Sequence, residues 1–254
     1  MPRARLIAVF LCVALAGPLA GVAWGGGALV AINNLILRAD GGFQPRWLPR
    51  HQFAPIDFQG HFDIAAKGGG KPVALEQAVV EFDRDGRLSA GGLPICRPEQ
   101  IASSSSAEAR RICAGAQVGT GRVEASVELG GAPVVVGAPL TLFNGPPQGG
   151  DPTVVLHARI DVPSTETFAI VIPIERQPGR FRYRATLNLP PIAGGLASIT
   201  HVGVKVGRRF SAGGRTRSYV SAHCSDGILQ THGRFIFADG TLIEGAVEKF
   251  CRAR

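Results

Sequence analysis

Strict alternation of apolar and polar residues is the feature that most constrains what this chain can fold into. The alternation recurs in five stretches, which are residues 56–64, 123–129, 168–174, 180–189 and 202–209. Successive side chains of a β-strand point to opposite faces of the sheet, so each stretch predicts a strand with one packed face and one face in water. Hydrophobic residues make up 45% of the chain, which is enough for the packed faces to build an ordinary globular core.

Turn residues, rather than long helical patterns, separate these stretches. Glycine pairs stand at 130–131, 194–195 and 213–214, and Asp239-Gly240 predicts a tight type I′ hairpin between 234–238 and 241–247. Short strands about a dozen residues apart, with no crossover helices, are typical of antiparallel sandwiches. We therefore predict an all-β fold, an antiparallel β-sandwich of about ten strands.

One short helix is expected inside this β-rich chain. Ser105 is followed three residues later by Glu108, which is the pattern of a capping box at a helix N-terminus. The helix should cover residues 107–114 and end at Gly115. It carries Cys113, so a disulfide bond can tether it to the preceding segment.

Four of the five cysteines form two local pairs, Cys96 with Cys113 and Cys224 with Cys251. Four cysteines allow three pairings, and the local one is favoured in an oxidising compartment because short loops close at a low entropic cost. Each bond would add about 3 kcal/mol to stability by the loop-entropy model. The alternative is a metal site, but the chain has no C-x-x-C spacing, so we expect neither a metal nor another cofactor.

The N-terminus indicates export. Arg3 and Arg5 precede an apolar run at 6–19, and small residues follow as far as Ala23, so residues 1–23 are predicted to be a signal peptide. The run is shorter than the ~20 residues of a membrane-spanning helix, although an uncleaved anchor is the alternative. No later segment is apolar enough to span a membrane, and we expect a secreted or extracellular protein that can associate with the cell envelope. Residues 24–52 are predicted to form a partly flexible N-terminal segment, and 53–254 a single β-sandwich domain.

Several short motifs, in their order along the chain, carry a resemblance to a known group. These are Gly92–Cys96, Val118–Gly121, Phe143–Gly145, Ser218–Cys224 and Phe237–Gly240. In these stretches the chain resembles an uncharacterised family of secreted actinobacterial proteins. The resemblance implies an exported, β-rich protein with two local disulfide bonds, and it implies no activity.

A secreted hydrolase is the enzymatic alternative. Ser221, His223 and Asp226 lie close together in the sequence, but the chain has no Gly-x-Ser-x-Gly elbow that would expose a nucleophilic serine. Catalytic triads are assembled by folding, so a site near Ser221 and His223 stays open at this point. We expect no enzymatic activity.

Basic residues on strand faces are the main functional hint. Arg180, Arg182 and Arg184 are predicted to share one strand face, and Lys205 and Arg209 share a face of a later strand. If these strands are neighbours, their field would concentrate an anionic partner. Arginines on exposed strands can instead serve to prevent aggregation between sheets.

The sequence therefore predicts a non-enzymatic module that binds anionic envelope polymers or lipid headgroups through these basic faces. The formal net charge of +8 becomes +6 once Arg3 and Arg5 are removed with the signal peptide. Export argues against nucleic acid as the partner. The oligomeric state is not indicated by any pattern.

The cysteine pairing gives a direct test. Peptide mapping of the exported protein without reduction should recover Cys96 linked to Cys113, and Cys224 linked to Cys251. Free thiols or a cross-pair in stoichiometric amount would overturn the local pairing.

Overall fold

The computed structural model describes residues 22–23 and 26–253. The predicted signal peptide, residues 1–23, therefore lies outside the described residues except for Val22–Ala23. These two residues form the short strand β1, which pairs in parallel with strand β19.

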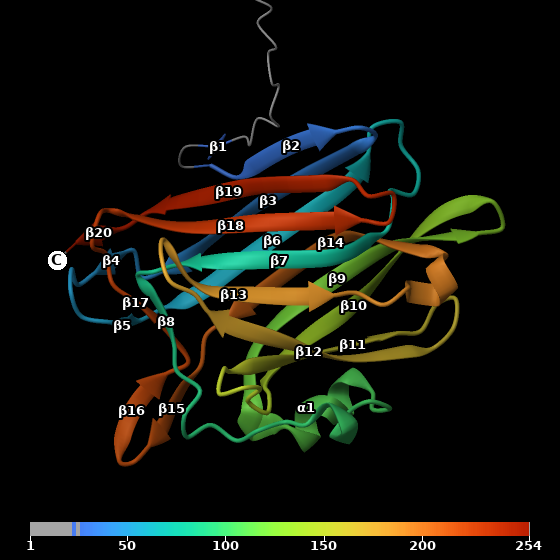
Figure 1. Cartoon of the computed structure of the whole chain (residues 1–254). Coiled ribbons are helices and arrows are strands. Elements are labelled where there is room, and N and C mark those ends of the chain that lie inside the picture. Colours follow the sequence, from blue (N-terminus) through green and yellow to red (C-terminus); the bar gives the residue numbers. More distant parts are fainter. Residues whose placement is uncertain (1–21, 24–25, 254) are drawn as a thin grey trace, which may run out of the picture.

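One large sheet of thirteen strands makes up most of the molecule (Figure 1). All of its pairings except β1 with β19 are antiparallel. In the order in which they are hydrogen-bonded, the strands are β1 (Val22–Ala23), β19 (Leu242–Phe250), β18 (Ile228–Phe237), β7 (Leu75–Asp83), β13 (Phe181–Asn188), β12 (Glu166–Arg176), β11 (Thr153–Ile160), β10 (Ala132–Asn144), β9 (Gln117–Leu129), β14 (Ala197–Val206), β6 (Asp57–Ala66), β3 (Leu35–Gln44) and β2 (Ala28–Ile32).

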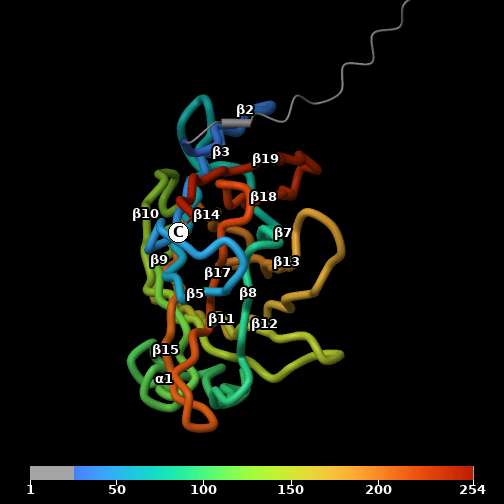
Figure 2. The backbone as a smooth tube through the Cα atoms, turned by 90° about the vertical axis from the view of Figure 1, so that its left-hand side faces the viewer, coloured from blue at the N-terminus to red at the C-terminus, as the bar shows by residue number. Residues whose placement is uncertain are grey.

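This sheet folds over on itself, so that its two halves pack face to face (Figure 2). Strand β19 contacts both β2 and β3, although they stand near opposite ends of the strand order. The fold is therefore all-β, a sandwich made from a single sheet that nearly closes into a barrel. This confirms the predicted fold class, with more strands than the ten or so that the alternation indicated.

The remaining strands form three small sheets at one end of the main sheet (Figure 1). Strands β15 (Arg209–Ala212) and β16 (Arg215–Ser218) form a projecting hairpin, and β4 (Trp47–Leu48) pairs with β20 (Arg252–Ala253). A three-stranded sheet, called here the end sheet, consists of β5 (Ala54–Pro55), β17 (Val220–Ala222) and β8 (Gly86–Leu88).

The predicted helix and its tether are confirmed. Helix α1 covers Ser106–Ile112, and its N-cap Ser105 accepts a hydrogen bond from the backbone N–H of Glu108 at 3.2 Å. The Cys96–Cys113 disulfide bond ties the end of α1 to the preceding loop. Together they bury Phe143 and Val155, so the helix covers the outer face of the sheet at β10 and β11. Short 3₁₀ turns lie at Pro98–Gln100, Ala114–Ala116 and Ile192–Gly195.

The second predicted disulfide bond, Cys224–Cys251, is also present, with its Cα atoms 6.0 Å apart. It joins the segment after β17 to the residue that follows β19. Both sulfur-bearing residues are buried in a cluster with Leu48 and Ile56. The bond therefore holds the end sheet against the main sheet.

One local expectation, the turn type at Asp239-Gly240, differs from the structure. The hairpin between β18 and β19 forms as predicted, but only Gly240 has a positive φ, of 80°, whereas a type I′ turn needs positive φ at both central residues. Asp239 does not adopt that conformation. Within the described part of the predicted N-terminal segment, residues 26–52, β2 and β3 extend the main sheet and β4 packs beside the end sheet.

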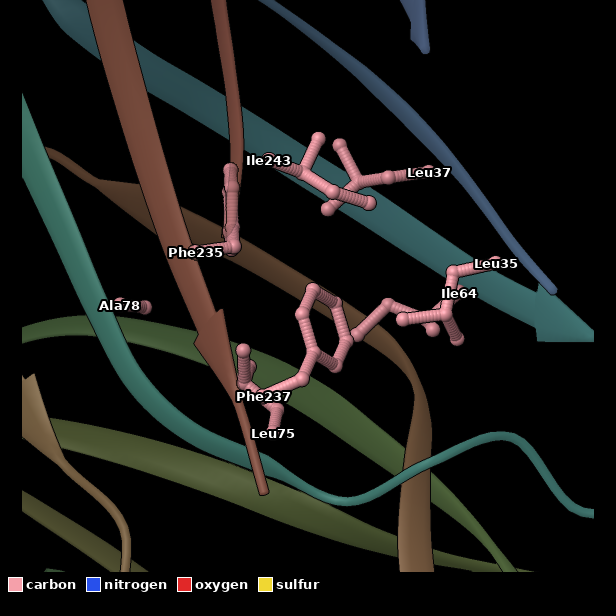
Figure 3. Close-up of a cluster of buried hydrophobic side chains, with 8 residues drawn as sticks. All are labelled: Leu35, Leu37, Ile64, Leu75, Ala78, Phe235, Phe237 and Ile243. Atoms are coloured by element: carbon pink, nitrogen blue, oxygen red, sulfur yellow. The ribbon is translucent and has the colours of Figure 1, made fainter. Parts of the chain in front are cut away.

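The largest group of buried side chains joins the two halves of the sheet (Figure 3). Leu35 and Leu37 of β3 face Phe235, Phe237 and Ile243 of β18 and β19. Phe237 is 1% exposed. Truncating a side chain as buried as this one loses the transfer free energy of its apolar atoms and also leaves a cavity in the core.

Replacing Phe237 by Ala should therefore lower the free energy of unfolding by about 3–5 kcal/mol. The matched control is Val135→Ala, since Val135 is 63% exposed and its loss should change stability by less than about 0.5 kcal/mol. Urea unfolding followed by circular dichroism measures both. Equal losses for the two variants would show that this cluster is not the core of the fold.

Candidate functional site

A wide groove lies on the surface next to the end sheet. Its volume is about 850 Å³. Its walls come from five parts of the chain: Phe53 before β5, β8 with the loop after it, the connection between β10 and β11, the adjoining ends of β12 and β13, and the hairpin strand β16. The fold assembles the groove, so no contiguous motif encodes it.

Four arginines line this groove: Arg87 of β8, Arg176 of β12, Arg182 of β13 and Arg217 of β16. No aspartate or glutamate is among its lining residues. Within residues 22–23 and 26–253, none of the four forms an ion pair with a carboxylate. Four like charges without counter-charges create a positive potential in the groove, which attracts anions.

An aromatic ring positions two of these cations. The guanidinium carbons of Arg87 and Arg182 lie 5.3 Å and 5.4 Å from the centre of the Phe53 ring, both within the range of cation–π attraction. The ring itself is held from the side by His223, whose ring centre is 4.8 Å away in an edge-on arrangement. Phe53 thus holds two arginines near one another without neutralising either.

An irregularity in β13 sends Arg182 to the groove. The pairing of β13 with β7 shifts between Phe181 and Tyr183, so that Arg182 is the extra residue of a bulge. Bulges redirect side chains relative to a regular strand. The Tyr183 side chain is buried beneath the groove, and its hydroxyl accepts a hydrogen bond from the Leu88 backbone N–H at 3.4 Å.

The other two arginines predicted on this strand face pair with glutamates instead of lining the groove. Arg184 donates to Oε1 of Glu81 through Nε at 3.1 Å and Nη2 at 2.8 Å, and Arg180 lies 4.0 Å from Glu248. Although partial burial by itself raises the pKa of Glu81, the hydrogen bonds from Arg184 and His232 outweigh it and hold that pKa below its usual value.

Lys205 and Arg209 do not join these arginines. Both are exposed, on β14 and β15 respectively. Four strands (β12, β11, β10 and β9) separate β13 from β14 in the sheet order. The structure therefore brings only Arg182, of the five predicted binding residues, into the groove.

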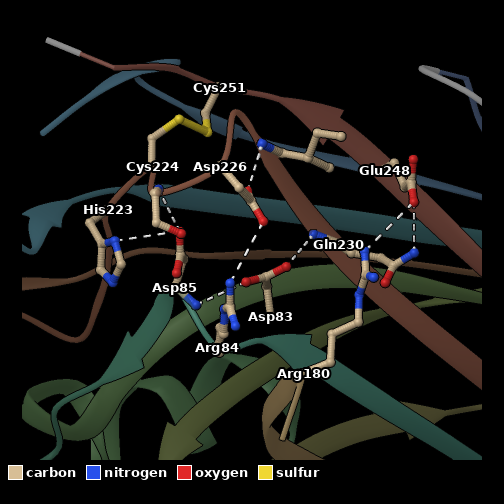
Figure 4. A network of polar contacts seen from close by, with 12 residues as sticks. Asp83, Arg84, Asp85, Arg180, His223, Cys224, Asp226, Gln230, Glu248 and Cys251 are labelled. Carbon is tan, nitrogen blue, oxygen red and sulfur yellow. Dashed lines mark hydrogen bonds and ion pairs between the residues drawn. A yellow bond between two sulfur atoms is a disulfide. The ribbon is translucent and has the colours of Figure 1, made fainter. Parts of the chain in front are cut away.

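Three different residues contact Ser221, His223 and Asp226. The Ser221 hydroxyl donates to the Arg87 carbonyl oxygen at 3.5 Å, and Nδ1 of His223 lies 3.4 Å from Oδ2 of Asp85 without the alignment of a hydrogen bond. Asp226 lies near Arg84 (Figure 4). In the described part of the chain no hydrogen bond joins the three residues, so nothing here activates Ser221 as a nucleophile.

A buried carboxylate network supports the end sheet instead (Figure 4). Asp85 accepts a hydrogen bond from the Ser225 N–H at 2.7 Å, and Asp83 accepts from the N–H groups of Asp85 and Gln230 at 2.9 and 3.0 Å. Burial raises the pKa of Asp83 despite these bonds. The network fixes the loop that carries Cys224.

The described residues, 22–23 and 26–253, also bear on metal binding and on membrane spans. Among them, no group of three or more histidine, cysteine, aspartate or glutamate side chains could hold a metal ion. No helix in the same residues is both long enough and apolar enough to cross a bilayer.

The sequence patterns missed Arg87, Arg176 and Phe53 as site residues. Arg87 belongs to a strand of three residues, too short for alternation to be recognised, and Arg176 ends its strand. Phe53 stands outside any strand. Their common position depends on the folded connections, which a single sequence does not show.

The Glu81–Arg184 pair predicts a pH effect on stability. A carboxyl group whose pKa is lower in the folded state stabilises the protein above its unfolded pKa, and this contribution is lost as the pH falls through the folded value. Glu81→Gln should therefore be less stable than the wild type at pH 7, and the difference should shrink below the ordinary value of 4.5.

The control for this pH effect is Glu76→Gln, on the same strand and exposed. Urea midpoints at pH 7, 5, 4 and 3 measure it. A difference between wild type and Glu81→Gln that stays constant with pH would show that Glu81 is not held ionised by its partners.

The groove can attract anions and grip oxyanions through its guanidinium groups, two of which lie over the Phe53 ring. It offers no nucleophile activated by a neighbouring base among the residues described. Comparison of the chain with protein-family models, with curated proteins and with solved structures gave no match.

Proposed function

We propose that this chain is an exported, non-enzymatic binding protein, acting at or outside the cell envelope, that holds an anionic polymer in the arginine-lined groove. One observation carries the proposal: four arginines surround a groove of about 850 Å³ whose lining contains no carboxylate. Clustered charge of one sign is unfavourable by itself, because the cations repel each other. A bound anion relieves that repulsion.

The chemistry of arginine favours phosphate or carboxylate groups as the ligand. The guanidinium group is planar, stays charged, and donates two parallel hydrogen bonds to either oxyanion. Two of the four groups are already positioned by Phe53, which reduces the entropy lost when they grip a ligand.

The size and the distribution of charge favour an extended ligand over a single small anion. The four arginines come from four strands around a groove of about 850 Å³, which is far larger than one phosphate or carboxylate group. A chain with repeated anionic groups can contact several at once, and each contact adds to the avidity. Lipid headgroups present the same oxyanions, and they form the second arm of the experiment.

Export is part of the proposal. The N-terminal pattern of a signal peptide and the resemblance to secreted actinobacterial proteins both support it. Two disulfide bonds are consistent with an oxidising compartment, where such bonds persist.

The test is cosedimentation with purified anionic envelope polymers across a salt series. The variant Arg87→Ser/Arg182→Ser/Arg217→Ser removes three groove charges. The matched control, Arg38→Ser/Arg50→Ser/Arg110→Ser, removes the same charge from exposed positions outside the groove. Wild type and control should bind alike, the groove variant should bind at least tenfold more weakly, and binding should weaken as salt rises to 0.5 M because charges are screened.

Two further comparisons extend the cosedimentation experiment. Anionic vesicles replacing the polymer report on lipid headgroups as the ligand, and Lys205→Ser/Arg209→Ser reports whether the basic surface extends beyond the groove. Equal loss in the groove variant and in its matched control would mean that net charge alone causes retention. Retention indifferent to salt would also reject the proposal.

A further inference from the structure

A second cavity lies inside the folded main sheet, separate from the groove. Its volume is about 250 Å³, and it is lined by residues of β2, β3, β6, β7, β14, β18 and β19. Phe58, Phe62, Phe82 and Val204 line it, yet all four are only partly buried. Large apolar side chains normally fill a protein interior to the density of an organic crystal, so partial exposure of inward-facing residues marks unfilled space.

Glycines keep this space open. Gly60, Gly233 and Gly245 occupy interior positions of strands and line the cavity. A Cβ atom at Gly245 would meet its nearest neighbour, the Cβ of Ala28, at 3.5 Å, an ordinary contact. A side chain is therefore compatible with the backbone there, and its absence leaves volume that the chain could have filled.

Side chains of two packed clusters form part of the cavity wall. Among them, Leu37 and Phe235 belong to the core cluster of Figure 3. Ile56 and Ala222 belong to the cluster around the Cys224–Cys251 bond. The end sheet separates the two cavities, since its Gly86 lines this one and the adjacent Arg87 lines the groove.

This mostly apolar space also has polar lining residues, among them His61, Asp83, Gln230 and one ion pair. Lys249 of β19 and Asp40 of β3 both line the cavity, with Nζ of the lysine 2.6 Å from Oδ1 of the aspartate. Strand β2 pairs with β3 only as far as Ala39, so in the described part of the chain β3 continues past it to Gln44 without a strand on that side. The pair therefore spans the seam between β3 and β19.

The two partners of this pair differ in exposure. The Lys249 side chain is 14% exposed, and that of Asp40 is 41% exposed. A mostly buried ammonium group needs a negative partner, since an unpaired buried charge is costly. Asp40 Oδ1 also accepts a hydrogen bond from the Gly41 backbone N–H at 2.7 Å, so a ligand carboxylate on Lys249 has to take the place of this aspartate.

We propose that this cavity binds an aliphatic carboxylate of roughly ten carbon atoms, with the chain in the apolar space and the carboxylate on Lys249. The proposed length follows from the cavity volume. An apolar cavity of about 150 Å³ binds benzene, which has six carbon atoms, so a cavity of about 250 Å³ should hold roughly ten. The inference stands apart from the groove and does not depend on its ligand.

Chain length and headgroup each make a measurable contribution. Burying one further methylene group should improve affinity about fourfold, until the cavity is full. The carboxylate should bind more tightly than an alcohol of equal length, because only the carboxylate can pair with Lys249 in place of Asp40.

Isothermal titration of the purified protein with octanoate, decanoate, tetradecanoate and decanol, each below its micelle concentration, tests the proposal. Affinity should rise from octanoate to decanoate by roughly fifteenfold for two methylene groups. It should not rise further for tetradecanoate. A steady rise to tetradecanoate would indicate adsorption to a surface and would overturn the proposal, as would no binding at all.

Variants locate the bound molecule. Gly245→Leu fills the cavity and should abolish decanoate binding, whereas Gly245→Ala controls for the change of backbone preference and should retain most of it. Lys249→Gln should erase the preference for decanoate over decanol. The groove variant Arg87→Ser/Arg182→Ser/Arg217→Ser should bind decanoate like the wild type, and loss of binding there would place the carboxylate in the groove instead.

Discussion

The contact between the two halves of one folded sheet is the interaction on which the rest of this structure depends. Leu35 and Leu37 on β3 meet Phe235 and Phe237 on β18, at nearly opposite ends of the strand order. A sheet with one apolar face must cover that face, and here it does so with its own other half. Because closure brings β19 to β2 and β3, the inner faces enclose a space, and the glycines in it decide how much is filled.

The second constraint is covalent and local. The Cys224–Cys251 bond and the hydrogen bonds of Asp83 and Asp85 hold the end sheet across one end of the enclosed space. Gly86 then faces the apolar cavity while Arg87 faces the arginine groove. Two environments of opposite character, one apolar and one cationic, are thus kept apart by three short strands.

The sequence predicted the elements whose causes are local. Alternation predicted the β-rich fold, Ser105 and Glu108 predicted the start of α1, and short separations predicted both disulfide bonds. Strands with runs of apolar residues, such as Val134–Val136 in β10, carry no alternation and were undercounted. The groove could not be predicted from the sequence, because the bulge at Arg182 and the positions of Arg87 and Phe53 depend on contacts between distant segments.

We propose that the end sheet separates two independent binding sites. The most direct measurement is the affinity for decanoate by isothermal titration, taken with and without a saturating amount of the anionic polymer. Independent sites have no coupling free energy, so the two affinities should agree within about twofold. Mutual displacement of the two ligands would contradict the account, because it would require one continuous site.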